Sequence, residues 1–353
     1  MTQTEPRVSI VVACRNESAH IRALLESIVQ QEWDNISWEA ILADGMSTDG
    51  TRSAVQGYSA RHPQIRMIDN SERIVSTGLN RAIRAARGDI IVRMDAHTKY
   101  ATDYCLRSLR ALETTGAANV GGPARTEAID IRSRAVAAAY HSRFSTGGAH
   151  FHDTAFEGWV DTVPYGCWHK TTLAQVGLFD ESLVRNQDDE LNLRIIRSGG
   201  KIWQDPAIVS WYSPRPRLSS LFRQYFQYGF WKVAVIRKHR LLASWRHLVP
   251  ASFVLINALL IVALLASMAM GSSVWTAISA IVWVALLGSY SAALLLFSMT
   301  TASQAGWATL PFLPVVFAAY HLSYGLGFLF GLRWLVAGPS SSRRESIFTS
   351  LTR

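Results

Sequence analysis

Acidic side chains follow three of the strands that the first hundred residues predict. Glu17 comes soon after the apolar run 8–13, Asp44 follows the run 39–42, and Asp95 follows the run 90–94. Because the carboxyl ends of parallel strands meet at one edge of a sheet, where α/β proteins bind their ligands, we expect these side chains to lie close together. Carboxylates at such an edge can accept hydrogen bonds from a ligand or bind a cation.

A histidine two positions after the third of these acids adds a second kind of donor atom. Asp95 and His97 could face one cation from the loop that leaves the strand. An imidazole is an acceptable ligand for Mn²⁺ beside carboxylate and phosphate oxygens. A lone Asp-Ala-His sequence is common in ordinary surface loops, so the metal hypothesis depends on its position after a strand.

Three further acids open a helix predicted over residues 188–198, which Gly199 and Gly200 end. A carboxylate in this position could act as a general base that removes the proton of an attacking hydroxyl. Acids at a helix N-terminus also complement the helix dipole, and we assign that structural role to Asp189 or Glu190.

Short apolar runs rich in β-branched residues alternate with helical patterns through the first 95 residues. This alternation is typical of a mostly parallel sheet covered by helices. The predicted strands are 8–13, 39–42, 65–68 and 90–94, and the predicted helices are 17–31, 50–59 and 76–86. The run 8–13 is short and is followed at once by charged residues, so it predicts a buried strand and no targeting signal.

Charge divides the 353 residues into two parts. Of the 61 charged residues, 56 lie in 1–246 and five in 333–353, so residues 247–332 contain none. The net charge of +9 divides into +6 and +3. A block this long without charge excludes a purely cytosolic protein, a disordered chain and a secreted disulfide scaffold. The three widely spaced cysteines offer no disulfide framework and no CxxC zinc site, which fits a reducing compartment.

Three stretches of the uncharged block are long enough to span a membrane, namely Leu248–Met270, Val274–Ser298 and about 309–332. Three spans would place the C-terminal tail on the side of the membrane opposite the first domain. The four arginines of the tail indicate instead that it stays on the cytosolic side. Pro311 and Pro314 could turn the third stretch into a re-entrant or kinked element, and the sequence leaves both topologies open.

A basic segment precedes the uncharged block. Residues 206–246 contain no acid, and residues 218–240 mix aromatic and basic side chains at helical spacing. This pattern is typical of a helix in the membrane interface, with Phe222, Phe226 and Phe230 toward the acyl chains and the cations toward headgroups or phosphates. The alternative is an ordinary surface helix of the first domain.

The run 42–51, LADGMSTDGT, resembles the (D)DGSTDGT signature of family 2 inverting glycosyltransferases with the GT-A fold. Residues 13–17, 86–97 and 186–194 are similar to the family's opening nucleotide motif, its strand entry with the DxD metal motif, and its E-D-x-D-L-x-x-R segment. Ala43, His97 and Gln187 stand where the family has an acidic residue. The resemblance covers about residues 7–240 and is strongest for succinoglycan-type membrane-bound glucosyltransferases.

The resemblance implies a role for each matching position. Asp188 would be the general base, and Asp95 and His97 would bind Mn²⁺ or Mg²⁺. The implied nucleotide-sugar residues are Ala13, Arg15, Glu17, Asp44, Asp95 and Ala96, with Asp44 on the nucleotide base. The implied acceptor-side residues are Tyr165, Gly166, Cys167, Trp168, Gln187 and Asp189.

The resemblance also implies an organisation: a GT-A α/β catalytic domain over residues 1–215, interfacial helices over 216–247, transmembrane helices over 248–332 and a basic tail over 333–353. The protein would be integral to the bacterial inner membrane, with its catalytic domain in the cytosol. It would transfer one hexose, expected to be glucose, from a UDP-sugar to a polyprenyl-diphosphate-linked saccharide in surface polysaccharide synthesis. Processive synthesis is not expected, because the Q-x-x-R-W motif is absent.

Two other functions stay open at this point. One is a glycosyltransferase whose acceptor is polyprenyl phosphate itself. The other is a membrane scaffold or transporter with a nucleotide-sensing domain, although the three hydrophobic stretches contain no charged residue and His321 is their one histidine, which makes a poor transport pathway. Membrane lipids are expected partners and nucleic acid is not, and the sequence does not predict an oligomeric state.

Overall fold

The computed structural model describes residues 5–212, 217–241 and 244–337. The part of the basic tail beyond residue 337, with Arg343, Arg344 and Arg353, lies outside these residues. The chain forms two units. The first contains the described parts of 1–127 and 149–213, and the second contains the described parts of 128–148 and 214–347.

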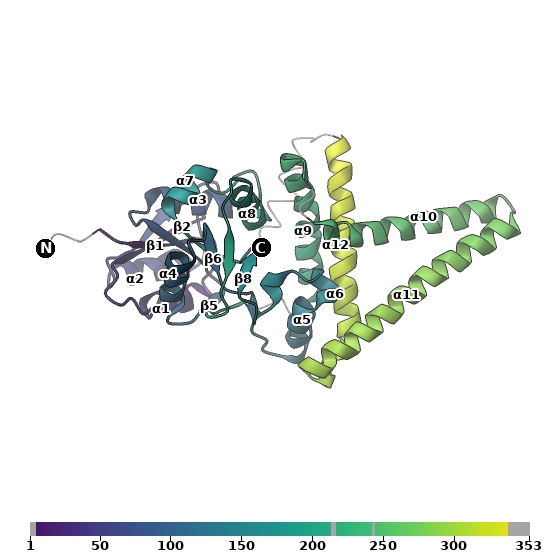
Figure 1. The fold of residues 1–353 in the computed structure, drawn as a ribbon, viewed down its shortest axis with the longest axis horizontal. Helices are drawn as coiled ribbons and strands as arrows, with labels where there is room; N and C mark the ends of the chain where they lie inside the picture. Colours follow the sequence, from purple (N-terminus) through teal and green to yellow (C-terminus); the bar gives the residue numbers. More distant parts are fainter. Residues whose placement is uncertain (1–4, 213–216, 242–243, 338–353) are drawn as a thin grey trace. The chain divides into compact units, whose positions relative to one another are not determined.

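An eight-stranded sheet forms the centre of the first unit (Figure 1). Its strands are β1 Val8–Cys14, β2 Trp38–Asp44, β3 Ile65–Asp69, β4 Ile90–Asp95, β6 Asn119–Gly121, β8 Gly158–Val160, β9 Cys167–His169 and β10 Ile202–Gln204. Their order is β3-β2-β1-β4-β9-β6-β10-β8. The first four strands are parallel neighbours, which confirms the predicted parallel core, whereas β9 runs antiparallel to β4 and β6.

Helices cover both faces of this sheet. They are α1 Ile21–Val29, α2 Thr51–Ser59, α3 Val75–Ala85, α4 Tyr104–Thr115, α7 Lys170–Val176 and α8 Gln187–Arg197. Alternation along β1 explains the two layers, because Val8, Ile10 and Val12 face a core shared with α1, α2 and α4. Val11 faces the other core, shared with α3, α7 and α8.

The predicted elements of the first 95 residues are all present, with one shifted boundary. The helix predicted from residue 17 begins only at Ile21, because residues 17–20 form a turn in which the Glu17 carbonyl accepts a hydrogen bond from the His20 N–H. A second, three-stranded sheet has the order β5-β11-β7, with bounds Thr98–Tyr100, Ser210–Tyr212 and Arg125–Thr126. The sequence did not predict these strands, since two or three residues carry no measurable periodicity.

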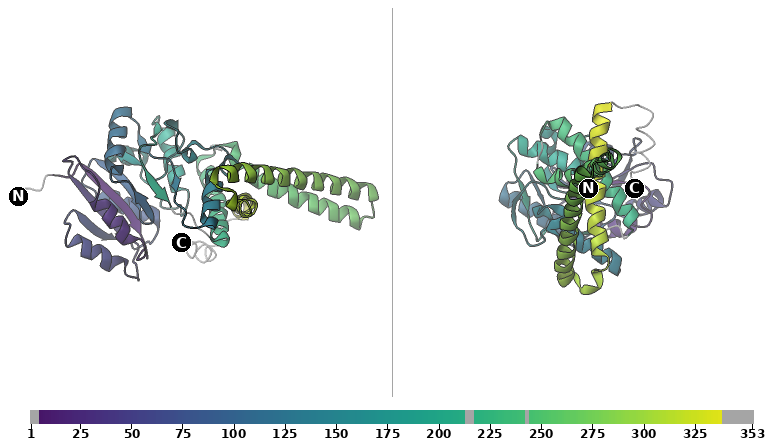
Figure 2. Two further views of the ribbon diagram at one scale, coloured as in Figure 1. Left: turned by 90° about the horizontal axis from the view of Figure 1, so that it is seen from below. Right: turned by 90° about the vertical axis from the view of Figure 1, so that its right-hand side faces the viewer.

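The second unit is helical in the part that the structure describes. Its α-helices are α5 Ile131–His141, α6 Arg143–Thr146, α9 Leu218–His239, α10 Val249–Ala269, α11 Ser273–Ala305 and α12 Leu313–Ala337. α10 and α11 form a hairpin, and α9 lies beside α12 (Figures 1 and 2). The sequence analysis had placed residues 128–148 within the first domain, 1–215. They belong instead to the second unit, because Ala135 and Val136 of α5 pack with Ala302 and Phe317.

α9 is packed against α12 along its apolar face. Phe230 is only 2% exposed, and its ring centroid lies 5.5 Å from that of Trp334 and 6.2 Å from that of Phe330. The expectation that Phe230 faces acyl chains is therefore wrong. Phe226 is half-buried against α12, and Phe222 is exposed as predicted.

Candidate active site

Hydrogen bonds join the loop after β1 to the loop after β2. The Asn16 N–H donates to Ser47 Oγ (2.7 Å), and the Thr48 N–H donates to Asn16 Oδ1 (2.8 Å). The Glu17 N–H donates to Thr51 Oγ1 (2.7 Å). Much of the STDGT sequence therefore fixes the shape of the sheet edge, which leaves few of its own groups for a ligand.

Asp49, in the loop after β2, also connects this loop to the loop after β1. Its carboxylate accepts from the Ser18 N–H (3.1 Å) and from the Thr51 N–H (3.0 Å). Burial alone would raise the pKa of Asp49, but the hydrogen bonds from Thr51 and Ser18 hold it well below its usual range. These contacts give Asp49 a structural role in the loop.

Ala13 and Arg15 lie at the carboxyl end of β1, on either side of its last residue. Both are partly exposed. Arg15 lies over Gly45, where a Cβ added to the glycine would be 3.0 Å from Arg15 Cβ. Glycine at this position therefore allows the arginine side chain to lie against the backbone of the second loop.

Asp44 is fully buried at the end of β2, and protein groups already hold its carboxylate. Oδ1 accepts from Ser47 Oγ (2.5 Å), and Oδ2 accepts from the Ser47 N–H (2.9 Å) and from Arg52 Nη1 (2.6 Å). Arg52 also pairs with Asp69 of β3 at 2.8 Å. A nucleotide base could reach Asp44 only after Arg52 moved away. In this structure Asp44 shapes the loop.

Glu17, Asp95 and His97 meet at this edge, as their positions after the strands predicted. His97 Nδ1 lies 3.5 Å from Asp95 Oδ1 and 3.8 Å from Glu17 Oε1. The exposed fraction of the side chain is 21% for Glu17, 25% for Asp95 and 45% for His97, so a ligand can reach all three. The Asp95 N–H donates to Tyr100 Oη at 2.6 Å, which fixes the loop that carries Asp95.

The donor atoms of Asp95 and His97 suit a divalent cation. A carboxylate oxygen and an imidazole nitrogen 3.5 Å apart can face one ion together. Residues 5–212, 217–241 and 244–337 contain no group of three or more His, Cys, Asp or Glu side chains that could hold a metal. A cation at this place would therefore take further oxygens from its ligand, such as those of a diphosphate.

A buried arginine connects Asp95 to the predicted base. Arg93 of β4 is 7% exposed, and its Nη1 forms an ion pair with Asp188 Oδ1 at the start of α8. Its Nη2 lies 3.9 Å from Asp95 Oδ2. One guanidinium thus stands between the two carboxylates. The sequence reasoning gave Arg93 no role, although a single charge in the apolar strand IIVRM was a visible signal.

Asp188 has an environment that suits a base. Burial raises the pKa of its carboxyl above the ordinary value of 3.8, the charge of Arg93 opposes that rise, and the charges of Asp189 and Asp95 add to it. A carboxylate that is more basic than usual and still partly accessible can accept a proton from a bound hydroxyl.

Tyr165 and Gly166 lie beside this pair of charges. The Tyr165 ring centroid is 5.9 Å from Arg93 Cζ, and Tyr165 Oη is hydrogen-bonded to Thr98 Oγ1 at 2.6 Å. The Gly166 carbonyl accepts from the Arg93 N–H at 3.1 Å. Gly166 has φ +106°, and a Cβ there would overlap the Trp168 ring, so the turn requires glycine.

Several predicted site side chains do not face the site. Cys167 and Trp168 are each 1% exposed within β9, so the expectation that they contact an acceptor is wrong. Burial also raises the pKa of the Cys167 thiol, which makes it unreactive. The side chain of Ala96 is 3% exposed, and that of Gln187 is buried and donates to the Val184 carbonyl at 3.4 Å.

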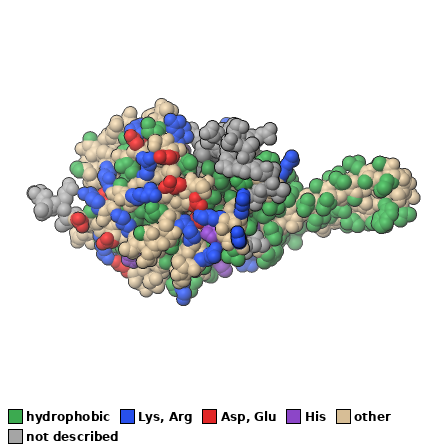
Figure 3. All heavy atoms as spheres, turned by 90° about the horizontal axis from the view of Figure 1, so that it is seen from above, with side chains coloured by type: hydrophobic (Ala, Val, Ile, Leu, Met, Phe, Trp, Pro, Cys, Tyr) green, Lys and Arg blue, Asp and Glu red, His purple; other side chains and the backbone are tan. Residues whose placement is uncertain are grey.

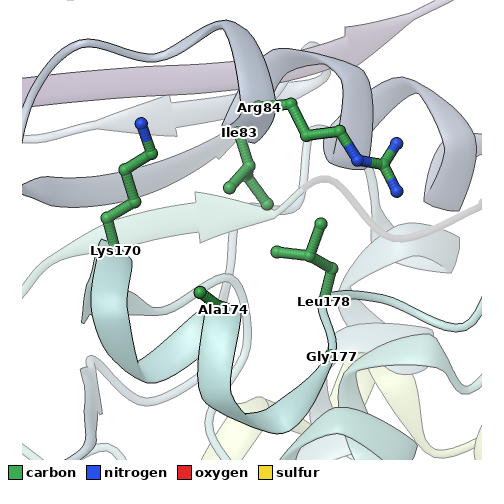
Figure 4. A pocket seen from close by; sticks show the side chains of 6 residues that line it. All are labelled: Ile83, Arg84, Lys170, Ala174, Gly177 and Leu178. Carbon is green, nitrogen blue, oxygen red and sulfur yellow. The ribbon is translucent and has the colours of Figure 1, made fainter.

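A separate open pocket of about 370 Å³ lies between α3 and α7 (Figure 4). None of the predicted site residues lines it. Its walls are largely apolar, with one cation from each of the two helices. The lining residues are Ile83, Arg84, Lys170, Ala174, Gly177 and Leu178. Lys170 directly follows β9, and its N–H donates to the Asp89 carbonyl just before β4, so the pocket is not at the carboxyl ends of β1, β2 and β4 and is not the candidate active site.

Comparison with known proteins gives a consistent result. Residues 9–168 match the model of "Glycosyl transferase family 2". The chain is 33% identical over 243 residues to the succinoglycan biosynthesis protein ExoA of Rhizobium meliloti, covering 68% of this chain and 73% of the relative. It is 28% identical over 240 residues to a Methanococcus voltae dolichyl N-acetyl-alpha-D-glucosaminyl phosphate 3-beta-D-2,3-diacetamido-2,3-dideoxy-beta-D-glucuronosyltransferase, covering 65% of this chain and 74% of the relative.

One solved structure resembles the whole fold. It is a mannosyltransferase from Pyrobaculum calidifontis, solved in complex with GDP-Man and Mn²⁺. The likeness has a TM-score of 0.57 at 20% sequence identity and covers 93% of this chain and 88% of the other. At this identity the likeness shows a shared fold.

Proposed function

Because the chain belongs to glycosyltransferase family 2, with the GT-A fold, we propose that it transfers one hexose from a nucleotide sugar to a lipid-linked saccharide, with inversion at the anomeric carbon. The observation that carries this proposal is the position of Arg93 between Asp95 and Asp188. One side chain thereby links the group proposed to meet the diphosphate to the group proposed to activate the acceptor.

Asp188 acts on the acceptor in this proposal. An acceptor hydroxyl attacks the anomeric carbon from the face opposite the nucleoside diphosphate, so a new C–O bond forms while the bond to the diphosphate breaks. The hydroxyl proton passes to the Asp188 carboxylate, whose raised pKa favours that transfer. Arg93 holds the carboxylate in place until the hydroxyl arrives.

Asp95 and His97 act on the donor. They would hold a divalent cation, Mn²⁺ or Mg²⁺, which supplies positive charge to the departing diphosphate when it is bound. Glu17 and Arg15 border the same edge and would contact the nucleotide sugar. Asp44 supports this edge through Ser47 and Arg52, and contacts the base only if Arg52 is displaced.

The relatives support the choice of acceptor. One acts in succinoglycan biosynthesis, and the name of the other describes transfer to a sugar already attached to a dolichyl phosphate. A lipid-linked saccharide therefore fits better than a bare polyprenyl phosphate. We propose UDP-glucose as the donor and the bacterial inner membrane, with the catalytic unit in the cytosol, as the location. The apolar helices of the second unit support a membrane protein.

A panel of UDP- and GDP-sugars tests the proposal. The full-length protein is incubated in membranes with a polyprenyl-diphosphate-linked saccharide, and release of nucleoside diphosphate is measured. We expect one UDP-sugar to support turnover, and Asp188→Asn to reduce turnover by about 10²–10⁴-fold while nucleotide affinity stays nearly unchanged.

Asp103→Asn is the matched control, because Asp103 is a partly exposed aspartate at the start of another helix, where it pairs with Arg107. It should retain full activity. If Asp188→Asn keeps more than about a tenth of the wild-type rate, Asp188 is not the base. Absence of turnover with every donor in the panel would contradict the transferase proposal itself.

A further inference from the structure

Three helices of the second unit are long and apolar enough to cross a membrane, but they differ in burial. The share of buried residues in the apolar stretch is 6% for α10 and 0% for α11, whereas it is 50% for α12. Figure 3 shows hydrophobic side chains over the surface of the α10–α11 hairpin. A helix that faces lipid on all sides needs no protein cover, so α12 has a different environment.

Glycines fix α12 against α9 along most of its length. A Cβ at Gly229 of α9 would overlap the Tyr324 carbonyl of α12, and a Cβ at Gly327 would overlap the Phe226 carbonyl. Farther along, a Cβ at Gly331 would lie 3.0 Å from the Phe230 carbonyl. Later residues of α9 thus meet later residues of α12, so the helices are parallel and in fixed register. They must lie at the same depth.

α9 cannot cross a membrane in this register. It carries four cations, Arg223, Lys232, Arg237 and Lys238. By length and composition, α9 is not among the candidate membrane spans of the described residues. Each cation near the bilayer centre costs about 3 kcal/mol or more. Because α12 is bound to α9, a membrane-spanning α12 would place Arg223 and Lys232 within the bilayer.

The hairpin gives an independent reason. The first turn of α10 meets the middle of α12, where a Cβ at Gly325 would overlap the Pro250 carbonyl and lie 2.8 Å from Val254 Cγ2. α10 has 21 residues and is about 32 Å long, which matches a hydrocarbon core of about 30 Å. If α12 crossed the membrane, its middle and the start of α10 would both lie at mid-bilayer, and α10, which runs across the direction of α12 (Figure 1), would lie in the plane of the bilayer and could not cross it.

α11 returns to the level from which α10 starts. Its first two-thirds are exposed, with Ile281 at 67% and Val284 at 65%, whereas Ser298, Thr301 and Ala302 are buried. Ala302 packs with α5 and with Leu313, at the start of α12. In Figure 1, α10 leaves from the middle of α12 and runs across its direction. In the left view of Figure 2, α12 (yellow) is seen nearly end-on while the hairpin runs lengthwise.

From this geometry we infer that the chain crosses the membrane twice, as the α10–α11 hairpin, and that α9 and α12 lie together along the membrane surface. The exposed apolar side chains of α10 and α11 then contact the acyl chains of the bilayer. The C-terminal tail then lies on the same side as the catalytic unit. This topology agrees with the arginines of the tail, which three spans would place on the wrong side.

Site-directed labelling tests this topology without any assay of activity. Single cysteines are introduced as S71C in the first unit, S273C at the tip of the hairpin and S341C in the tail. Ser71 and Ser273 are exposed, and the native cysteines are at most 7% exposed and give little background. Intact spheroplasts and inverted vesicles are treated with a membrane-impermeant maleimide, with detergent-permeabilised samples as the control for reactivity.

We expect S71C and S341C to be labelled from one side and S273C from the other. Labelling of S341C together with S273C, opposite S71C, would show three crossings and overturn the inference. Labelling of all three positions from one side would show that the hairpin does not cross, which would also overturn it. The result does not depend on the proposed reaction.

Discussion

Arg93 places one positive charge between a carboxylate on β4 and a carboxylate on α8, and each partner affects the other's ionisation. Asp188 must be ionised to accept a proton, so activity should rise with pH through its pKa, which lies above 3.8. The Arg93 charge lowers that pKa, and the Asp189 charge raises it. The position of the acid limb of the pH profile therefore reports how the charges of Arg93 and Asp189 change the pKa of Asp188.

Two variants should move the acid limb in opposite directions. Arg93→Met removes the cation, so the pKa of Asp188 rises and the acid limb of kcat/KM moves to higher pH. Asp189→Asn removes a neighbouring anion, so the limb moves to lower pH. Rates measured between about pH 4 and pH 8 test both shifts. Identical profiles for the two variants would show that Asp188 does not control the rate.

The metal proposal leads to a second prediction at single residues. Asp95→Ala should lower turnover by about a hundredfold or more, because a cation no longer stabilises the negative charge that develops on the leaving diphosphate. His97→Ala should have a smaller effect, since water can fill one coordination position. Binding of Mn²⁺ in the presence of UDP, followed by electron paramagnetic resonance, should weaken in both variants. Full activity of the wild-type protein in excess chelator would contradict this site.

Sequence reasoning succeeded where a residue follows a long strand. The positions of Glu17, Asp95 and His97 after their strands predicted that they meet, and they do. It failed for Cys167 and Trp168, which form a buried three-residue strand in a region without clear periodicity. A loop and a short buried strand look alike in one sequence, because only the partner strand distinguishes them.

At the level of elements, the amino end of β2 holds a buried charge that the sequence reasoning passed over. Glu39 is 1% exposed and accepts from Ser9 Oγ (2.9 Å) and from the Arg87 N–H (2.6 Å). Arg66 and Arg87 lie within 3.3 Å of it. Burial alone would raise the pKa of Glu39, but these partners hold it below its usual range.

Glu39→Ala should therefore reduce the free energy of unfolding by about 2 kcal/mol, because the buried Ser9 hydroxyl and the Arg87 N–H lose their acceptor, whereas the Arg66 and Arg87 side chains are exposed. Since the folded pKa is lowered, this stabilisation is present above the unfolded pKa of about 4.3 and is lost as the pH falls below it. Denaturant unfolding of the protein in detergent measures both effects. Glu113→Ala, which removes an exposed ion pair with Arg7, is the control and should cost less than about 1 kcal/mol. Equal losses would contradict the assignment.

Helices with a clear apolar period, such as α3 and α8, were predicted closely, and α10 was predicted from the length of its uninterrupted apolar run. Elements without that signal were missed. α5 has little apolar asymmetry around its axis, and its partners lie far along the chain, so no local pattern indicated where it belongs. Long-range packing decides such cases.

At the scale of the whole molecule, the cations of α9 should affect the acceptor more than the donor. Arg223, Arg237 and Lys238 are exposed, whereas Lys232 is 8% exposed and is not suitable for replacement. Changing the three exposed cations to Gln should reduce transfer to a lipid-linked acceptor about a hundredfold in anionic vesicles, because each cation near such a surface contributes about 1 kcal/mol. UDP affinity, measured by calorimetry, should not change.

The control replaces three exposed cations of the first unit, Arg61, Arg107 and Arg110, with Gln. That variant should transfer normally. If the α9 variant loses UDP affinity and lipid-linked transfer equally, the helix supports the fold and does not serve the membrane surface.

Composition alone predicted a charged part and an apolar part, and it left the number of membrane crossings open. Length and hydropathy treat α10, α11 and α12 alike. What separates them is the contact of α12 with α9 through glycines, and that contact joins residues about a hundred positions apart. No window along a single sequence can detect it.

The assignment of α5 to the second unit has a consequence for biosynthesis. The ribosome makes α5 before the last strands of the catalytic unit, but its partners Ala302, Leu313 and Phe317 emerge only with the final helices. Until then the apolar side chains of α5 lack the cover that α11 and α12 provide, and a nascent chain in that state is prone to aggregate. A fragment truncated before α10 would keep that defect permanently, so a soluble catalytic fragment should require polar replacements at Val136 and Ala139, or a chaperone.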